Sequence, residues 1–406
     1  MPNSIEHIRA DFPFFSQPDA PIYLDSAATA QKPQCVIDRI TAYYTSENAN
    51  IHRGGYPLAA AATRAFEQAR ADIAAFIGAK PEQVVFTLNA TDALNQAASM
   101  LAPRIRPGCN VVATALEHHS ALLPFMRLCA ERDAELRLIP LGEDGTPKLD
   151  LLDCLTDEHT CAAVITAGAS ANGWRAPLDR LLPFFASRGI PVVLDATQRI
   201  VHERLDFSQL GCDFLCFSGH KLYGPTGVGV LAIRDEELPP ARLGGGAVRE
   251  VTGSGFSLLG SPQAYEAGTP PIAQALGLQA ATGYLRRCDL AALFAREAAM
   301  TQRLIDGLSA IGGIRIVPAG EDRLPIVAFT CDVLHPADMA QLLAARGVAL
   351  RCGQHCAHIA HRHLGLESTL RASVGVYTNE ADIDALLEAV NHIQHKWRTR
   401  YGSRHA

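Results

Sequence analysis

The chain has 406 residues, of which 48% are hydrophobic and 19% are charged, and its net charge is −6. This length allows a large core and favours two domains, and the composition is ordinary for a soluble α/β enzyme. The slightly acidic balance, without blocks of like charge, argues against nucleic acid or an anionic membrane as the main partner. We find no apolar run of the roughly 18 residues that a membrane helix needs.

The cysteines and the N-terminal residues bear on the compartment. Eleven cysteines are scattered along the chain, and residues 1–15 lack the apolar segment of a signal peptide. Free thiols are typical of a reducing compartment. We therefore expect a cytoplasmic protein.

The first two-thirds of the chain alternates between short apolar strands and helices. A strand and small-residue turn (22–33), a helix (33–46), a polar loop (48–55) and an alanine-rich helix (59–77) come first. Strands are then expected at 83–88, 110–114, 136–141, 161–168 and 190–196, with helices at 92–101, 120–132, 150–155 and 179–188. This alternation predicts an α/β fold with a mostly parallel sheet, helices on both faces and ligands beyond the carboxyl ends of its strands.

The pattern changes after residue 271. A long helical stretch (272–311) leads into a smaller α+β unit with strands near 314–318, 325–331 and 348–352 and a closing helix at 380–398. We predict an N-terminal segment (1–21) packed with the small domain, a large domain (22–285) and a small C-terminal domain (286–406). The Gly- and Ser-rich segment 244–271 predicts an excursion, such as a hairpin towards a partner subunit.

Lys221 lies in a glycine-rich segment, FSGHKLYGPTGVG (217–229), between two apolar runs. The pattern predicts a strand, a tight loop and a second strand. Burial would lower the pKa of this lysine and free its lone pair, as a Schiff-base lysine requires. Ser218 and His220 beside it could donate to an anionic phosphate. The alternative is a surface lysine in a hairpin, so the other parts of a pyridoxal phosphate site decide between the two.

A second candidate segment is the apolar strand that ends in Asp195. A carboxylate at the carboxyl end of a buried strand can hold the pyridine nitrogen of a cofactor protonated. Gln198, three residues later, could hydrogen-bond the cofactor's phenolic oxygen. The alternative is that Asp195 only caps the next helix.

Two strand–helix junctions offer further contacts. Free amides of Ala90, Thr91 and Asp92 at a helix start would make a phosphate cradle, with the Thr91 hydroxyl added. An ordinary helix N-cap is the alternative there. In the next junction, His118 could stack on a cofactor ring, or it could be an ordinary surface or core histidine.

The C-terminal part carries a second set of chemical residues, in the segments RCGQHCAHIAH (351–361) and LRASV (370–374). Arg351 ends a predicted strand and opens a loop with His355 and Cys356, where a cysteine beside a histidine suits a thiolate nucleophile. Arg371 could bind a substrate carboxylate through two parallel hydrogen bonds.

The density of histidine and cysteine in 352–363 invites a comparison with metal sites. The spacing fits no zinc pattern, and we expect His358 and His361 on a solvated helix face and no bound metal. A regulatory disulfide between Cys352 and Cys356 is a further hypothesis for this segment.

These motifs together resemble the cysteine desulfurases of the second group (Suf/Csd type), class V members of the fold-type I pyridoxal phosphate enzymes. The resemblance runs from 22 to about 390 and includes YLDSAAT, NIHRG, EHH, LDATQ, SGHKLYGPTGVGVL, EAGTP, RCGQHCA and TLRAS. SGHKLYGPTG is specific for this branch, and an R-x-G-x-H-C-A loop marks the second group. The resemblance implies a mostly parallel sheet flanked by helices and a smaller α+β C-terminal domain.

The resemblance also implies a role for each matched residue. Lys221 would bind pyridoxal 5′-phosphate covalently and move protons, Asp195 would pair with the pyridine nitrogen, and His118 would stack on the ring. The remaining cofactor contacts would come from Gln198 at the ring oxygen, from Ala90, Thr91, Ser218 and His220 at the phosphate, and from Thr269 of the neighbouring subunit in a homodimer.

The implied reaction converts L-cysteine into L-alanine. Arg371 would bind the substrate carboxylate beside Ala28, and Cys356 would attack the substrate sulfur and keep it as a persulfide. A small SufE-like protein or a reductant would then accept the sulfur, for iron–sulfur cluster or sulfur-cofactor assembly.

Several positions depart from the family pattern. The usual asparagine after the strand preceding Asp195 is Ser170, unless Asn172 replaces it from a shifted loop. Other departures are Tyr56, Ala121 and Pro271. They leave open a selenocysteine lyase or another class V lyase, and a non-catalytic paralogue that acts as a binding or scaffold protein.

Overall fold

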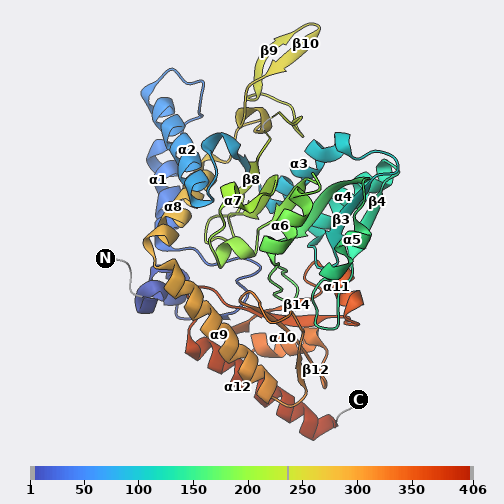
Figure 1. Cartoon of the computed structure of the whole chain (residues 1–406). Coiled ribbons are helices and arrows are strands. Elements are labelled where there is room, and N and C mark those ends of the chain that lie inside the picture. The colour runs from blue at the N-terminus through green and yellow to red at the C-terminus, as the bar shows by residue number, and fades with distance from the viewer. Residues whose placement is uncertain (1–4, 236, 403–406) are drawn as a thin grey trace.

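The computed structural model describes residues 5–235 and 237–402, and its centre is a sheet of seven strands. In spatial order these are β2 (Val84–Thr87), β8 (Gly229–Ile233), β7 (Phe214–Ser218), β6 (Val192–Asp195), β5 (Thr160–Thr166), β3 (Asn110–Thr114) and β4 (Glu135–Ile139). Six strands of this sheet run in one direction, and β8 runs in the opposite direction. The predicted α/β fold with a mostly parallel sheet is confirmed (Figure 1).

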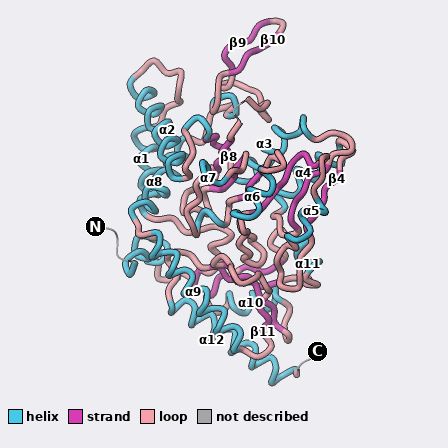
Figure 2. The backbone as a smooth tube through the Cα atoms, viewed as in Figure 1, coloured by secondary structure: helices cyan, strands magenta, loops and turns pink. Residues whose placement is uncertain are grey.

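Helices cover both faces of this sheet (Figure 2). They are α1 (Gln34–Ala42), α2 (Pro57–Phe76), α3 (Ala90–Leu101), α4 (His119–Glu131), α5 (Leu152–Leu155), α6 (Leu178–Ala186), α7 (Phe207–Leu210) and α8 (Ile272–Arg287). Alternate strand residues face opposite ways: Val85 and Val111 share a cluster with α3 and α4, whereas Val84 and Val112 share one with α2, α6, α7 and α8. Because both faces are buried, the strands read as continuous apolar runs.

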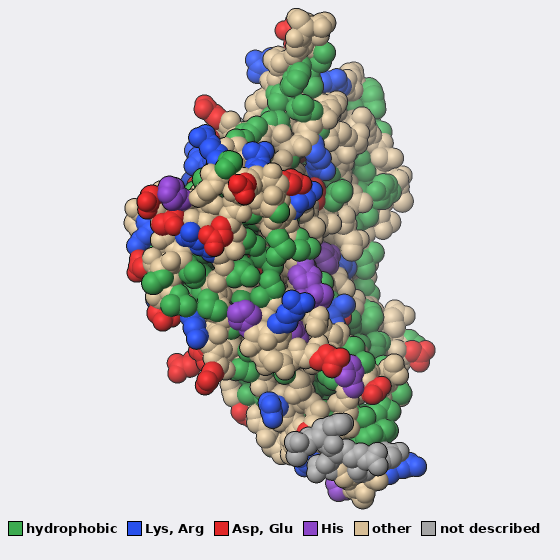
Figure 3. All heavy atoms as spheres, turned by 90° about the vertical axis from the view of Figure 1, so that its right-hand side faces the viewer, with side chains coloured by type: hydrophobic (Ala, Val, Ile, Leu, Met, Phe, Trp, Pro, Cys, Tyr) green, Lys and Arg blue, Asp and Glu red, His purple; other side chains and the backbone are tan. Residues whose placement is uncertain are grey.

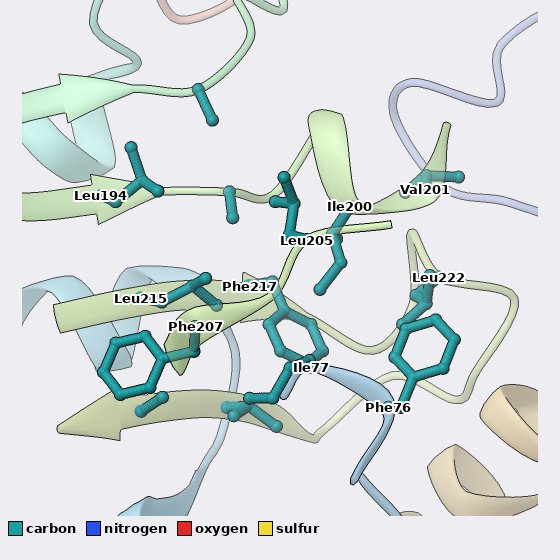
Figure 4. Close-up of a cluster of buried hydrophobic side chains, with 14 of the residues drawn as sticks. Phe76, Ile77, Leu194, Ile200, Val201, Leu205, Phe207, Leu215, Phe217 and Leu222 are labelled. Atoms are coloured by element: carbon teal, nitrogen blue, oxygen red, sulfur yellow. The ribbon is translucent and has the colours of Figure 1, made fainter. Parts of the chain in front are cut away.

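A tightly packed apolar group lies beneath the carboxyl ends of β6 and β7 (Figure 4). Leu194 and Phe217 from these strands belong to one buried cluster with Ile77, which caps the end of α2, and Leu205. All four side chains are at most 5% exposed. This packing gives the loops that follow β6 and β7 a rigid base.

The C-terminal part has its own four-stranded antiparallel sheet. Its elements are β11 (Ile314–Ile316), β12 (Ile326–Cys331), β15 (Thr369–Ser373), β14 (Arg351–Gly353), α9 (Leu290–Ala310), α10 (Pro336–Ala344), α11 (His358–His363) and α12 (Glu380–Tyr401). The long helical stretch expected over 272–311 consists of two helices, because Cys288 is extended and Asp289 caps α9 by accepting from Ala292 N at 3.1 Å. α8 packs on α1 and α2 of the large part, whereas α9 packs on α12 of the C-terminal part. The break between α8 and α9 lies close to the domain boundary predicted at 285, and that boundary stays a prediction.

The N-terminal segment contacts both parts of the molecule. Arg9 donates to Asp382 on α12 at 2.6 Å, and Phe12 packs edge-on against Tyr223 and Tyr377. β1 (Ile22–Tyr23) then pairs in parallel with β13 (Val348–Ala349). The described part of segment 1–21 thus contacts α12 as well as the large part, and its assignment to the small domain stays a prediction; residues 1–4 lie outside the described residues.

Segment 244–271 contains the hairpin of β9 (Val248–Thr252) and β10 (Gly255–Leu258), which projects from the body in Figure 1. Val251 and Phe256 on it are 70% and 57% exposed. That this hairpin reaches a partner subunit stays a prediction. Acidic and basic side chains are interspersed on the face drawn in Figure 3. Across the described ranges, each helix is too short or too polar to cross a membrane.

Candidate active site

A cavity of about 440 Å³ opens at the carboxyl ends of the parallel strands, between the large sheet and the C-terminal part. This is the place that an open α/β sheet favours for a ligand. Twelve of the predicted site residues line it: Ala28, Ala90, Thr91, His118, Ser170, Asp195, Gln198, Ser218, His220, Lys221, Cys356 and Arg371. Two others, Asn172 and Thr269, do not.

Lys221 projects from the short connection between β7 and β8. The loop is folded back on itself because Gly219 N donates to Val228 O and Gly224 N donates to Gly219 O, both at 2.9 Å. Burial lowers the pKa of Lys221 to about 8, and the nearby carboxylate of Asp195 opposes part of that shift. The amine is therefore neutral far more often than an exposed lysine, as a Schiff-base lysine needs.

The start of α3 forms a cradle for an anion. Asn89 caps the helix by accepting from Asp92 N at 2.9 Å, and Ala90 N donates to Ser218 Oγ at 2.7 Å. Thr91 also lines the cavity, and its hydroxyl is hydrogen-bonded to Ser120 Oγ at 2.7 Å. A Cβ on Gly229 would lie 2.5 Å from the carbonyl carbon of Asn89, so only glycine lets β8 approach this turn. A helix N-terminus beside hydroxyl groups fits a phosphate.

Asp195 lies at the end of β6, with its carboxylate directed to the cavity. Its Oδ1 accepts from Thr197 N at 3.0 Å, which leaves Oδ2 for a pyridine nitrogen. The hydroxyl of Thr197 is buried without a partner. Gln198 Nε2 donates to Ala27 O at 2.9 Å, which fixes the amide at the cavity wall.

Two histidines in the cavity are held neutral. His118 caps α4, and its Nδ1 accepts from Ser120 N at 3.1 Å, so Nε2 carries the proton. Burial, followed by the charge of Lys221, lowers the pKa of His118 to about 4. The same two causes lower the pKa of His220 to about 4. A neutral, flat imidazole can stack on an aromatic ring without bringing a second charge.

Glu117, next to His118, is a functional neighbour to which the sequence reasoning gave no role of its own. Its Oε1 accepts from Thr166 N at 2.9 Å and from Thr114 Oγ1 at 2.8 Å. Burial raises the pKa of Glu117 to about 8. The carboxyl group of Glu117 thus links the ends of β3 and β5. In the sequence, the EHH motif was the only indication that Glu117 belongs to the site.

The opposite wall of the cavity carries two guanidinium groups. Arg371, on β15, donates to Ser170 O at 2.9 Å and to Asp25 Oδ1 at 3.3 Å. Arg351 donates to both oxygens of Asp25, at 2.9 and 3.2 Å. Burial lowers the pKa of Arg371 only to about 10, so it remains a cation at neutral pH. Sequence reasoning missed Asp25, although a carboxylate directly after a strand, in YLDSAAT, was a usable signal.

Cys356 lies on a tight loop after β14, at the mouth of the cavity, and is exposed. The loop is held because His119 N donates to Cys356 O and Ala357 N donates to Gln354 O, both at 2.9 Å. His355 and Cys356 have φ of 50° and 55°, in the left-handed region that residues with a side chain rarely adopt. Such backbone strain is typical of functional sites.

The expectation that His358 and His361 share a solvated face is wrong for His361. His358 is exposed, whereas His361 is 2% exposed and lies beneath the Cys356 loop against Thr369. The helix is short, and one side of it packs into the core through Ala360. In the part of the chain that the structure describes, no group of three or more His, Cys, Asp or Glu side chains surrounds a metal position.

Asn172 and Thr269 lie away from this cavity. The Asn172 amide is fully buried: its Nδ2 donates to Gly145 O and Pro318 O at 2.9 Å, and its Oδ1 accepts from Trp174 N. The expectation that Asn172 could replace the missing asparagine is therefore corrected, and Ser170 occupies that position. Thr269 is exposed, and its reach to a neighbouring subunit stays a prediction.

The family model of the class V aminotransferases matches residues 22–386. The chain belongs to the class V aminotransferase family. The probable cysteine desulfurase of Pseudomonas aeruginosa is 39% identical over 389 residues, which are 94% of this chain and 96% of that protein. The cysteine desulfurase of Pectobacterium atrosepticum is 36% identical and covers 97% of this chain and 98% of its own length.

Two solved cysteine desulfurases share the fold of this class V chain. The S-sulfonic acid form of CsdA from Escherichia coli has a TM-score of 0.90 and 34% identity, over 97% of this chain and 99% of that one. The apo enzyme from Thermococcus onnurineus NA1 has a TM-score of 0.93 and 32% identity, over 96% of this chain and 98% of that one. The chain therefore lies in the cysteine desulfurase branch of its family.

Enzymes of this family use pyridoxal 5′-phosphate, and the cavity fits that group. The amides and hydroxyls at Ala90, Thr91 and Ser218 suit the phosphate, while Asp195 Oδ2 suits a pyridine nitrogen. The unpaired Thr197 hydroxyl is a further polar group at this wall. The buried amine of Lys221 completes the polar lining of this wall.

Proposed function

We propose that this protein is a pyridoxal phosphate-dependent cysteine desulfurase that converts L-cysteine into L-alanine and keeps the sulfur on Cys356 as a persulfide. The observation that carries the proposal is the content of one cavity: Lys221, Arg371 and Cys356 all line it. A base, a carboxylate-binding cation and a thiol are the three functions that this reaction needs from the protein.

The cofactor, when bound, supplies an electron sink for the substrate's carbon atoms. Arg371 binds the α-carboxylate, and its fixed orientation on Ser170 O and Asp25 leaves a second N–H on each of Nη1 and Nη2 for the substrate. Lys221, whose pKa of about 8 is close to neutral pH, can both accept and return a proton at the substrate carbon.

Cys356 carries out the sulfur transfer. Its Sγ, as a thiolate, forms a bond to the substrate sulfur while the bond between that sulfur and the substrate's Cβ breaks. The electron pair stays with the carbon, which takes up a proton and leaves as part of alanine. Because Cys356 is exposed at the cavity mouth, an external acceptor can reach the persulfide.

We further propose a homodimer, a small SufE-like protein as the sulfur acceptor and a role in iron–sulfur cluster or sulfur-cofactor assembly in the cytoplasm. The exposed Val251 and Phe256 on the β9–β10 hairpin and the exposed Thr269 favour a subunit contact. All eleven cysteines are free, which fits a reducing compartment.

The deciding experiment compares wild type, Cys356→Ala and Cys352→Ala with L-cysteine and a reductant, counting alanine and sulfide. We expect equal amounts of both from wild type and a loss of about 10²-fold or more in Cys356→Ala, which retains the cofactor absorbance. Cys352, an exposed neighbour, is the matched control and should retain turnover. Undiminished sulfide from Cys356→Ala would exclude the persulfide on Cys356, and an inactive wild type would direct the search to selenocysteine and other amino acids.

A further inference from the structure

Two polar atoms in the substrate-facing wall are buried without a hydrogen-bond partner: Nδ1 of His355 and Nε of Arg371. The two residues are 8% and 3% exposed, so water does not readily satisfy these atoms. A buried donor or acceptor that lacks a partner destabilises the state that contains it. Whether the two can satisfy each other depends on which nitrogen of His355 carries the proton.

Hydrogen bonds beneath the loop decide this. His361 Nδ1 lies 3.1 Å from Ala357 O, and because a carbonyl only accepts, this nitrogen carries the proton. Burial lowers the pKa of His361, so its ring is neutral and Nε2 is an acceptor. Nε2 lies 3.2 Å from Thr369 Oγ1, and the Thr369 hydroxyl therefore donates to it.

The single proton of Thr369 then fixes His355. His355 Nε2 lies 2.9 Å from the same Oγ1, which can only accept there, so His355 donates through Nε2. If Thr369 donated instead to Gly353 O, at 3.4 Å, lone pairs of Thr369 and His361 would face each other. We call His355, Thr369 and His361 the loop network. It leaves Nδ1 of His355 as a bare acceptor.

His355 is a poor base for Cys356. Burial, followed by the charge of Arg371, lowers the pKa of His355 to about 2, so the ring stays neutral throughout the physiological range. A ring of this kind acts through its lone pair, as a hydrogen-bond acceptor.

The strand register places Arg371 close to Thr369, the hydrogen-bond partner of His355. Gly353 pairs with Thr369, and Arg351 pairs with Arg371. Thr369 and Arg371 are two residues apart on β15, so their side chains leave the same face of the sheet. His355 is hydrogen-bonded to Thr369, and among the nearby charges Arg371 lowers the pKa of His355 most.

We propose that Arg371 Nε–H donates to His355 Nδ1 when the guanidinium binds the substrate carboxylate, so that His355 is the positioning residue of Arg371. This rests on the proposed function, in which Arg371 binds L-cysteine. The loop network selects the tautomer that can accept this bond. Because His355 precedes Cys356, the contact also ties the nucleophile's loop to the presence of substrate.

Two substitutions at His355 separate the two ring nitrogens. His355→Asn retains an acceptor near Nδ1 and loses the contact with Thr369, whereas His355→Gln retains a polar group near Nε2 and loses Nδ1. We expect KM for L-cysteine to rise about tenfold in His355→Gln and less than about twofold in His355→Asn, with kcat within about threefold in both. A merely structural role predicts the reverse order, since Asn breaks the loop network. The control is His363→Gln, which changes an exposed histidine on α11, the helix that also carries His361.

A second measurement needs neither turnover nor a variant. ¹⁵N NMR of histidine-labelled enzyme should show the His355 ring protonated on Nε2, with an Nδ1 resonance that moves when the product L-alanine is added. A ring protonated on Nδ1, or an Nδ1 resonance unaffected by saturating L-alanine, overturns the proposal. If wild type fails to turn over L-cysteine, the proposed function fails. If wild type is active and the Asn and Gln variants have the same KM, this inference alone fails.

Discussion

The two walls of the active-site cavity are built differently. On the cofactor side, Asp195, Ser218 and Lys221 follow directly from buried strands, and backbone or side-chain hydrogen bonds already hold the groups around them. On the substrate side, His355 and Cys356 have left-handed backbone, and His355 and Arg371 each retain an unpaired buried atom. The cofactor wall is thus held in place before any ligand binds, with the Thr197 hydroxyl as its unpaired buried group, whereas the substrate wall combines strained backbone with the unpaired atoms of His355 and Arg371.

The largest expected effect comes from removing the centre of the cofactor wall. Lys221→Ala should abolish the absorbance of the lysine-bound cofactor and reduce alanine formation about 10³-fold, because both the covalent link and the proton carrier are lost. Absorbance spectra of the purified variant and alanine assays test this. An unchanged absorbance band would show that another group binds the cofactor covalently.

The second prediction concerns what supports the cofactor wall from behind. Glu266 receives two hydrogen bonds from Arg70, at 2.7 and 2.9 Å, and one from Phe86 N, and the Arg70 and Glu266 side chains are 1% and 5% exposed. Glu266→Gln removes the buried counter-charge of Arg70, which keeps its ion pair with the more exposed Glu67 at 2.9 Å, and should lower the free energy of unfolding by about 3 kcal/mol, measured by urea titration. Glu47→Gln, at a more exposed ion pair with Arg39, should change it by less than about 1 kcal/mol. Equal effects of both would mean that the rigidity of this wall does not depend on Glu266.

The third prediction addresses the substrate wall. Arg371→Lys keeps the charge and loses the planar pair of donors, so KM for L-cysteine should rise about 10- to 100-fold while the cofactor absorbance stays unchanged. Steady-state kinetics measure this, with Arg315→Lys at an exposed position as the control. A change in cofactor absorbance as large as the change in KM would show that the two walls are not independent.

The smallest effect is a pH dependence. Attachment of pyridoxal phosphate to cofactor-free protein requires the neutral amine of Lys221, whose pKa is lowered to about 8. The attachment rate should therefore rise about tenfold between pH 7 and pH 9 and then level off, since protonated amine is lost as pH passes the pKa. Stopped-flow absorbance measures it. A rate that keeps rising to pH 10.5 would indicate an ordinary, solvated lysine.

The same contrast explains what the sequence could predict. Lys221, Asp195 and the 89–92 turn follow strand ends, and strand ends are visible as apolar runs bounded by turn residues. Their convergence on one cavity follows from the parallel topology. The chain positions of these residues were therefore predictable, whereas Thr197 and Glu117 were not identified.

The substrate wall was predictable only in its reactive side chains. Cys356 and Arg371 were identified, but the bonds of Asp25 to both guanidinium groups link residues far apart in the chain, which no local pattern reports. The misplacement of His361 has the same origin, because tertiary contact with Thr369 decided which side of its short helix is buried. Asn172 was misassigned because only the fold shows that its amide is used by Gly145 and Pro318.

The reversed strand β8 has a consequence for how the enzyme is made. It lies between β2 and β7 in the sheet. Val84 of β2 therefore has no strand to pair with until Ala232 of β8 has been synthesised. A nascent chain whose residue 233 is still inside the ribosome has synthesised the 89–91 turn, yet that turn lacks the strand against which Asn89 packs. Pairing across so much sequence is slow, and it comes late. We therefore expect the cofactor to be acquired after the central sheet has been completed, so that its binding would report that the large part of the chain has folded.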